Sequence, residues 1–342
     1  MTLRSSAEPL DRAYGLAMFD LDGVVYLLSN PVPGVPEAIG RAEAAGCQSI
    51  FVTNNASRLT STVADSLRSM GIDCRDDQVV SSAQAAARAI ADHCGEGAAT
   101  FMTGSPAFRA ALENEGLAIV DDPREAVAVA QGFFPTMQLK DLASATLAAR
   151  RGAYWVVANL DATLPTPDGP MPGMGAYVKV VETALGRGPD VVAGKPRPTI
   201  FRAALERVPD ARPLMVGDRP DSDIEGANAL GIDSLLVFSG VVKPASALRL
   251  PPERRPTYLG WTAAELNNPQ PEVTVEEPGA AHCEEWSVKL VSGTLTLSGK
   301  GDELSAWRAL CAAAWSAVDA GAEFSDGLAA VGAEAESALT TA

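Results

Sequence analysis

Short apolar runs that end in polar residues, and that are followed by helical periods, constrain the fold of this 342-residue chain most strongly. The runs at 16–19, 48–53, 212–217 and 233–240 read as strands, and the spacing of apolar residues between them indicates helices. Strands that alternate with helices favour a mostly parallel sheet in an α/β fold. The length suggests roughly two domains.

The segment after the second run predicts a helix that opens near Ser57 and carries Leu59, Val63, Leu67 and Met70 on one face. The middle of the chain has an α/β rhythm of its own. Strands are expected there at 99–104, 126–132 and 153–161, and helices at 106–116 and 139–152. This block is long enough to form a separate domain.

After about residue 250 the pattern changes. The proline-rich stretch 267–279 reads as a linker, 286–299 as a hairpin and 302–321 as a helix. Trp307 and Leu310 lie on one stripe of that helix, which favours core packing or a dimer contact over a cofactor site. The stripe therefore leaves open whether the protein forms a homodimer.

Two carboxylates, Asp20 and Asp22, interrupt an apolar run at the predicted carboxyl end of a strand, and Gly23 follows them. A buried carboxylate costs several kcal/mol to desolvate unless a partner compensates it. Ligands of open α/β sheets bind beyond the carboxyl ends of the strands, and a glycine lets the backbone approach a ligand closely. Taken alone, the motif also fits an ordinary turn or a calcium loop.

Three further strand ends carry polar side chains, which are Thr53, Asn54 and Asn55; Lys195; and Asp218, Asp221 and Asp223. A hydroxyl and amides before a helix suit an anion, because the helix start offers free N–H groups. Lys195, between a strand and a helix, would add a positive charge to an anion site, although most lysines are solvated surface charges. The acids after 212–217 are more than a helix N-cap requires.

In this order, the four motifs resemble those of the haloacid dehalogenase (HAD) superfamily of phosphatases, over about residues 14–262. More narrowly, "DLDGVVY", "VTNNASR", "GKP" and "GDRPDSDIEGA" are similar to the NagD-type branch. That branch includes phosphatases for phosphoglycolate, pyridoxal phosphate and glycerol phosphate. Ser222 stands where threonine is commoner in the branch.

The resemblance implies three parts. A Rossmann-like parallel-sheet core is expected over 1–83 and 187–262, with an inserted α/β cap of the C2 type over 84–186. A small α+β extension over 272–342 is similar to that of actinobacterial glycerol 3-phosphate phosphatases. Since all four motifs lie upstream of 270, the extension is expected to be dispensable for the catalytic strands.

The resemblance also implies a Mg²⁺ site and a nucleophile. Asp20 would attack phosphorus and become an aspartyl phosphate, and a divalent cation would relieve the repulsion between this carboxylate and the phosphate. The implied ligands are the Asp20 carboxylate, the Asp22 backbone carbonyl and the Asp218 carboxylate, with Asp223 orienting them from outside.

The remaining roles follow from the same resemblance. Asp22 would protonate the leaving group and then activate water. The phosphoryl oxygens would be held by Gly23, Thr53, Asn54, Asn55 and Lys195.

The loop 159–177 of the cap, rich in proline and glycine, is expected to shape the leaving-group pocket, with Asp161, Gly173 and Gly175 in the contact region. A surface loop that only joins strand to helix is the alternative.

The composition narrows the range of expected binding partners. A net charge of −16 argues against nucleic acid and against an anionic membrane surface, but a bound metal could still admit an anionic substrate. The five cysteines include no CxxC pair and read as buried thiols of a reducing cytosol. With no apolar signal core at the N-terminus and no run of about 18 apolar residues, a cytoplasmic location is expected.

The expected function is therefore a Mg²⁺-dependent phosphatase for a small phosphomonoester. Glycerol 3-phosphate comes first, and phosphoglycolate, pyridoxal phosphate and sugar phosphates are the alternatives. A phosphotransferase with a sugar acceptor is a close variant. A non-catalytic binding or scaffold protein is disfavoured by the complete set Asp20, Asp22, Lys195 and Asp218. An acyltransferase-like module in the extension is disfavoured because it has no glycine-rich acyl-CoA loop.

Overall fold

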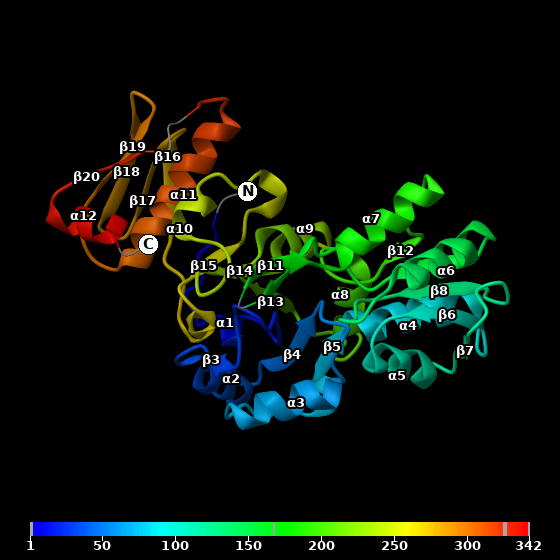
Figure 1. The fold of residues 1–342 in the computed structure, drawn as a ribbon. Helices are drawn as coiled ribbons and strands as arrows, with labels where there is room; N and C mark the ends of the chain where they lie inside the picture. The colour runs from blue at the N-terminus through cyan, green and yellow to red at the C-terminus, as the bar shows by residue number, and fades with distance from the viewer. Residues whose placement is uncertain (1–2, 167, 324–326, 341–342) are drawn as a thin grey trace. The chain divides into compact units, whose positions relative to one another are not determined.

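The computed structural model describes residues 3–166, 168–323 and 327–340. It forms two compact units, the first made of Met1–Ser49, Met70–Ile72 and Asp210–Ala342, the second of Ile50–Ser69 and Asp73–Pro209. Both units combine helices with parallel strands, as the sequence predicts (Figure 1). Pro167 in the loop 159–177, and parts of the predicted extension, lie outside the described residues.

The first unit contains four parallel strands in the order β15, β14, β13, β1. These strands are β1 (Leu16–Phe19), β13 (Pro213–Gly217), β14 (Asp233–Val237) and β15 (Tyr258–Gly260). In the register, Phe19 of β1 faces Val216 of β13. The two carboxyl ends therefore lie at one edge, and the residues that follow them become neighbours.

Short helices and a small hairpin complete this part of the unit. They are α1 (Leu10–Ala13), α2 (Val35–Ala44), the π-helical turn η2 (Pro220–Ile224), α9 (Glu225–Ala229), α10 (Pro244–Ala247), the 3-10 helices η3 (Pro252–Arg254) and η4 (Ala263–Asn267), and the paired strands β2 (Tyr26–Leu27) and β3 (Asn30–Pro31).

The C-terminal segment forms a second sheet in the same unit, and helix α11 (Glu303–Asp319) packs against it (Figure 1). Strands β16 to β19 are antiparallel and β20 runs parallel to β19. The strands and the last helix are β16 (Val273–Glu277), β17 (Ala280–Cys283), β18 (Trp286–Val291), β19 (Thr294–Ser298), β20 (Leu328–Val331) and α12 (Ala333–Thr340).

Helix α11 is buried on almost every side, as expected for a helix surrounded by protein. Trp307 and Leu310 are 1% and 0% exposed, so the stripe they form is core. Both belong to one hydrophobic cluster with Leu236 of β14 and Leu259 of β15. The extension thus shares a core with the parallel sheet, which contradicts the expectation that the catalytic strands are independent of it.

The linker expected at 267–279 is also wrong in part, because Val273–Glu277 forms strand β16. Three consecutive β-branched residues, Val273, Thr274 and Val275, favour a strand there. The prolines at 271 and 278 flank the strand instead of interrupting its hydrogen bonds.

In the second unit, residues 51–53 of β4 (Gln48–Thr53) pair in parallel with β5 (Val79–Ser81). A five-stranded parallel sheet has the order β12, β9, β8, β6, β7. Its strands are β6 (Ala99–Thr103), β7 (Ala118–Val120), β8 (Ala128–Gln131), β9 (Tyr154–Val157) and β12 (Val191–Val192), and the antiparallel pair β10 (Thr163–Thr166) and β11 (Gly169–Pro172) forms a separate hairpin. The helices are α3 (Thr60–Ser69), the 3-10 helix η1 (Asp76–Gln78), α4 (Ser82–Cys94), α5 (Pro106–Asn114), α6 (Leu139–Arg150), α7 (Met174–Leu185) and α8 (Pro198–Leu205).

Two local predictions in this unit need correction. Helix α3 begins at Thr60, not near Ser57, because the Asn55 side chain accepts hydrogen bonds from the N–H and hydroxyl of Ser57 and forms a turn there. Val63 and Leu67 are buried as predicted, whereas Leu59 precedes the helix and is 47% exposed.

Cys47, Cys74, Cys283 and Cys311 are buried free thiols, as predicted, but Cys94 is only partly buried. Burial raises the pKa of the Cys47 thiol to about 12, so it is inert at neutral pH. Within the described ranges, the structure has no helix that is both long and apolar enough to cross a bilayer.

Asp233 at the start of β14 predicts a pH dependence of stability. Burial raises its pKa, but hydrogen bonds from Tyr14 (2.7 Å) and Arg212 (2.8 Å) outweigh burial, so the net shift is downward. A lowered folded-state pKa adds stability above the unfolded value near 4, and this stability is lost as pH falls through the folded-state pKa.

We therefore expect Asp233→Asn to lower the free energy of unfolding at pH 7 by about 1–3 kcal/mol. Urea unfolding at pH 7 and pH 3 should show the difference from wild type shrinking at low pH. The exposed Asp73→Asn is the control, and a difference that does not depend on pH would contradict the expectation.

Candidate active site

Asp20, Asp218 and Asp223 form an acidic cluster in the first unit. One carboxylate oxygen from each lies within 4.8 Å of the others, and all three side chains are buried. Asp20 directly follows β1 and Asp218 directly follows β13, and the Asp20 N–H donates to Val216 O (2.9 Å). The parallel register thus brings together the two acids predicted from strand ends.

The π-helical turn η2 supplies the third acid. The N–H groups of Asp223 and Ile224 donate to Arg219 O (3.0 and 3.4 Å), and this wide turn folds Asp223 back so that its carboxylate accepts from the Arg219 N–H (3.0 Å). The helix predicted between the runs at 212–217 and 233–240 is therefore a π-helical turn followed by a short α9. Such turns are frequent at functional sites.

Glycines make room for the cluster. Gly23 adopts a left-handed φ of 91°, and a Cβ on it would overlap the Asp218 carboxylate. A Cβ on Gly240 would also overlap Asp218, and a Cβ on Gly217 would overlap Asp223. At these three positions only glycine lets the backbone approach the acids so closely.

The charge of the cluster calls for a cation. Two unit charges 4 Å apart repel by about 4 kcal/mol at an effective dielectric constant of about 20. Partial desolvation raises the pKa of the exposed Asp221, but the Arg219 guanidinium pairs with it (2.9 and 3.1 Å) and holds its pKa low. Carboxylate oxygens are the ligands that Mg²⁺ and Ca²⁺ prefer, so the donor set fits a hard divalent cation.

Asp22 is set apart from the three buried acids. Its side chain is exposed, and it lies in a turn in which the Gly23 N–H donates to Tyr26 O (2.8 Å). An exposed carboxylate can exchange protons with water, as a general acid and base must.

The second unit gathers the polar residues of the other two motifs. The Asn54 side chain accepts from the Lys195 N–H (2.8 Å) and donates to Lys195 O (3.2 Å), which joins the two motifs through one amide. Lys195 is 4% exposed, and its ammonium donates to Val52 O (3.2 Å). Thr53 is the last residue of β4, and its hydroxyl accepts from the Asn55 N–H (3.1 Å).

Lys195 follows a strand and precedes α8, as predicted, but that strand is β12 of the five-stranded sheet. Val191 of β12 pairs with Val156 of β9. Gly194 also approaches this site closely, because a Cβ on it would meet Asn54 Oδ1 at 2.6 Å.

Two residues of this site were missed at the level of sequence. The Asn159 amide donates to Asn54 O (2.7 Å), and the Ser82 hydroxyl donates to the same oxygen (2.7 Å). Both fix the backbone of the Asn54 motif. Neither has a sequence signal, because a single asparagine or serine is common in any loop or helix start.

Asp161 of the loop 159–177 contacts the same amide. The Asn54 side chain lies 3.3 Å from both Asp161 carboxylate oxygens. Gly173 and Gly175 pack against this part of the loop, and the Gly175 N–H donates to Asp161 O (2.9 Å). A Cβ on either glycine would overlap the backbone of residues 160–163. The structure thus gives both glycines a packing role, and their contact with a substrate stays a prediction.

Comparisons with known proteins decide the family. The model described as "Haloacid dehalogenase-like hydrolase" matches residues 17–118, and a related HAD-hydrolase-like model matches 192–266. The D-glycerol 3-phosphate phosphatase of Mycobacterium tuberculosis is 38% identical over 314 residues, which cover 88% of this chain and 85% of that protein. The chain belongs to the haloacid dehalogenase-like hydrolases.

Other relatives agree. An acid sugar phosphatase of Staphylococcus haemolyticus is 34% identical over 66% of this chain and 85% of its own length. The glycerol phosphate phosphatase of M. tuberculosis, solved with magnesium, superposes with a TM-score of 0.86 at 36% identity over 98% of both chains. A p-nitrophenyl phosphatase of Archaeoglobus fulgidus gives 0.70 at 30% identity, over 74% of this chain and 98% of its own.

These findings confirm the predicted family, the α/β HAD fold and the class of phosphoric monoester hydrolases. HAD phosphatases use Mg²⁺, and the same M. tuberculosis enzyme has also been solved with calcium. In this HAD-like hydrolase, the cluster of Asp20, Asp218 and Asp223 is a group of acids that could hold such an ion.

The extension has its own resemblance. A model described as a GCN5-related N-acetyltransferase-like domain matches residues 283–342. The likeness to an acyltransferase, which the lack of a glycine-rich acyl-CoA loop disfavoured, is therefore present in this segment, although the match shows no activity. The start of α11 carries the Asp302 carboxylate, which accepts from the Ser305 N–H (3.0 Å) and occupies the place where a helix would otherwise hold a phosphate.

Proposed function

We propose that this HAD-like hydrolase cleaves glycerol 3-phosphate through an aspartyl-phosphate intermediate on Asp20, with Mg²⁺ as its metal. The acidic cluster carries the proposal, because three buried carboxylates within 4.8 Å need a cation. The substrate is supported by the M. tuberculosis phosphatase, whose likeness spans 98% of both chains and so includes the extension.

Asp20, Asp218 and the backbone carbonyl of Asp22 would hold Mg²⁺, and Asp223 would orient them. The cation would supply charge neutralisation for the phosphate dianion. Asp20 then attacks phosphorus through its carboxylate, the bond to the ester oxygen breaks, and Asp22 donates a proton to that oxygen. In the second half Asp22 takes a proton from water, which attacks phosphorus and releases phosphate and free Asp20.

The polar residues of the second unit would bind the phosphoryl oxygens. The Thr53 hydroxyl, the amides near Asn54 and Asn55, and the Lys195 ammonium are donors of the kind that stabilise charge in phosphoryl transfer. Gly23 would let the backbone approach the phosphoryl group closely. The Asn54 side chain bonds both the N–H and the carbonyl oxygen of Lys195, so it would keep the lysine in place.

The cap predicted at 84–186 would select the leaving group, with Asp161 and Gly173 in the contact region. Phosphoglycolate, pyridoxal phosphate and sugar phosphates are the competing substrates, and the staphylococcal relatives favour sugar phosphates among them. The domain boundaries, a cytoplasmic location and a homodimer stay predictions from the sequence.

A substrate panel tests the proposal. We expect kcat/KM for glycerol 3-phosphate to exceed that for glucose 6-phosphate and for a nucleotide by about tenfold or more, since a capped site discriminates by leaving-group size. Phosphoglycolate and pyridoxal phosphate belong in the same panel, with released inorganic phosphate as the measure. A preference for hexose phosphates would overturn the substrate but leave the phosphatase in place.

Metal removal is a separate prediction. EDTA should abolish phosphate release and excess Mg²⁺ should restore it, because the buried acids would otherwise repel the substrate. Calcium should inhibit, since its looser coordination lets Asp20 bind through both oxygens and misdirects the attack. Full activity in metal-free buffer would contradict the proposed metal site.

A further inference from the structure

The loop that follows β14 contacts the acidic cluster directly. The Val241 N–H donates to Asp218 Oδ2 at 2.6 Å, and the Ser239 hydroxyl donates to Gly23 O at 2.7 Å. Between them, Gly240 packs so closely on Asp218 that a Cβ would overlap it. The position of residues 239–241 therefore fixes one oxygen of Asp218 and the backbone of the Asp20 motif.

The same loop is anchored in the extension. Phe238, Val242, Ala247 and Leu248 are each less than 9% exposed and belong to the hydrophobic cluster that surrounds α11. One directional polar contact joins the loop to α11, because the Trp315 indole N–H donates to Ala247 O at 2.9 Å. Trp315 is 2% exposed, so water does not readily replace this bond.

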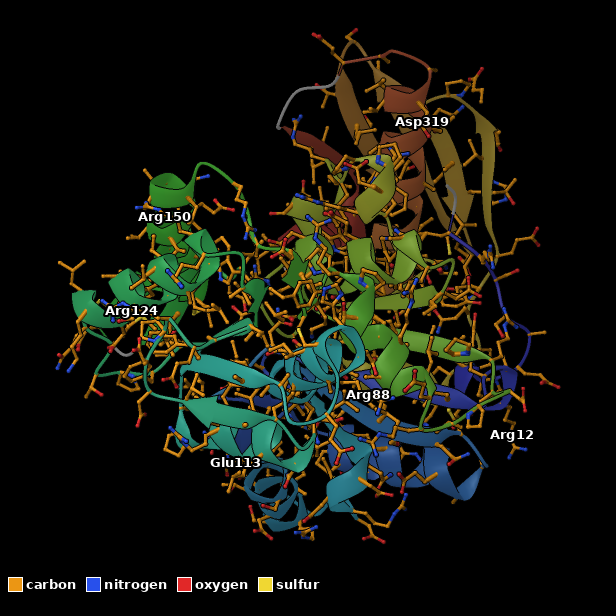
Figure 2. All side chains as sticks on the ribbon, turned by 90° about the vertical axis from the view of Figure 1, so that its right-hand side faces the viewer. Arg12, Arg88, Glu113, Arg124, Arg150 and Asp319 are labelled. Atoms are coloured by element: carbon orange, nitrogen blue, oxygen red, sulfur yellow. The ribbon has the colours of Figure 1, made fainter. Side chains whose placement is uncertain are left out.

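A buried arginine fixes the end of the loop. Arg255 is fully buried, and its guanidinium donates to Leu250 O (3.0 Å) and to both Asp319 carboxylate oxygens (2.8 and 2.7 Å). It also lies 5.5 Å from the centre of the Trp315 ring. Figure 2 shows Asp319 on α11, of which it is the last residue. An acid there opposes the helix dipole, and its pairing with Arg255 explains why it is tolerated.

We infer that α11 positions the metal site, with Trp315 as a positioning residue that acts on Asp218 through residues 238–247. The inference rests on the proposed function in that Asp218 is taken as a Mg²⁺ ligand. Metal-ligating carboxylates depend on the groups that hydrogen-bond to them, and here that group is the Val241 amide. The extension is thus part of the catalytic apparatus without touching the substrate.

Trp315→Phe tests the inference, because it removes the indole N–H and keeps an aromatic ring in the core. Trp307→Phe is the matched control, since it makes the same change on the same helix, and the Trp307 indole N–H has no hydrogen-bond partner among the residues that the structure describes. Two readouts are needed, the Mg²⁺ dissociation constant by calorimetry without substrate, and amide hydrogen exchange of the peptide that contains Val241.

We expect Trp315→Phe to weaken Mg²⁺ binding by about three- to tenfold, less than the 10- to 100-fold typical of a direct outer-shell change. Exchange at the Val241 peptide should accelerate in the same variant. Trp307→Phe should bind Mg²⁺ within about twofold of wild type, because it removes no hydrogen bond. Equal behaviour of the two variants, in either direction, would overturn the inference.

Asp319→Asn is a second variant that keeps the inference testable if Trp315→Phe does not fold. It removes the charge that holds Arg255 and should change both readouts in the same direction, and wild-type values in a folded Asp319→Asn would count against the inference. If wild type itself binds no Mg²⁺, the proposed function fails, and the exchange at Val241 still decides whether α11 holds the loop.

Discussion

Asp20→Asn is expected to reduce phosphate release by at least about a thousandfold while the protein stays folded. Asparagine is nearly isosteric with aspartate but has no anionic oxygen to attack phosphorus. Asp20 is also one of the three buried acids, so its neutralisation lowers the negative charge available to hold a cation. Single-turnover phosphate release from glycerol 3-phosphate is the measurement, with thermal unfolding to confirm the fold.

Asp233→Asn serves as the control for this result. Asp233 begins β14, whereas the acidic cluster lies beyond the carboxyl ends of the strands, so this variant should lose stability and keep its turnover. A rate for Asp20→Asn above about a thousandth of wild type would rule out Asp20 as the nucleophile.

Removal of residues 272–342 is expected to give insoluble or largely unfolded protein, although all four motifs lie upstream. The deletion would expose Leu236 and Leu259, which are fully buried beneath the C-terminal segment. It would also leave the buried Arg255 guanidinium without Asp319. Each large apolar side chain brought into water costs about 1.5–3 kcal/mol. Exposing these two leucines together with Ile224, Phe238 and Val242 of the same cluster would cost about 7.5–15 kcal/mol, which matches the 5–15 kcal/mol that usually stabilises a protein.

A point variant keeps this prediction measurable where the deletion yields no protein. Leu310→Ala in α11 should lower the free energy of unfolding by about 2–5 kcal/mol, since Leu310 is fully buried. Val318→Ala on the same helix, where the side chain is 45% exposed, should cost less than about 1 kcal/mol. A soluble deletion protein with wild-type turnover, together with a mild Leu310→Ala, would show that the extension is not part of the core.

The strand ends that carry the catalytic motifs could be predicted from the sequence, because each is an apolar run that stops at a polar residue. Asp20 and Asp218 follow β1 and β13 as expected, and the parallel register makes them neighbours. The third acid of the cluster was also predicted, but not the π-helical turn that brings Asp223 to it. A π-helical turn depends on one wide hydrogen bond and has no periodic signal.

The contacts that support these motifs could not be predicted. The Val241 amide on Asp218 and the Trp315 indole on Ala247 join segments that are far apart in the sequence. Nothing in a single valine or tryptophan tells which distant carbonyl or carboxylate it will meet. The strand β16 was missed for a different reason, because the prolines that flank it read as a linker.

The central claim is that Asp20 becomes phosphorylated during turnover, and chemical trapping tests it most directly. Borohydride reduces an acyl phosphate to an alcohol, so quenching the enzyme during turnover of glycerol 3-phosphate with Mg²⁺ should convert Asp20 to homoserine, which peptide mass spectrometry reads at position 20. We predict homoserine at Asp20 in the presence of substrate and Mg²⁺, and none with EDTA. Homoserine at another aspartate, or an unmodified Asp20 in samples that release phosphate at the normal rate, would contradict the account.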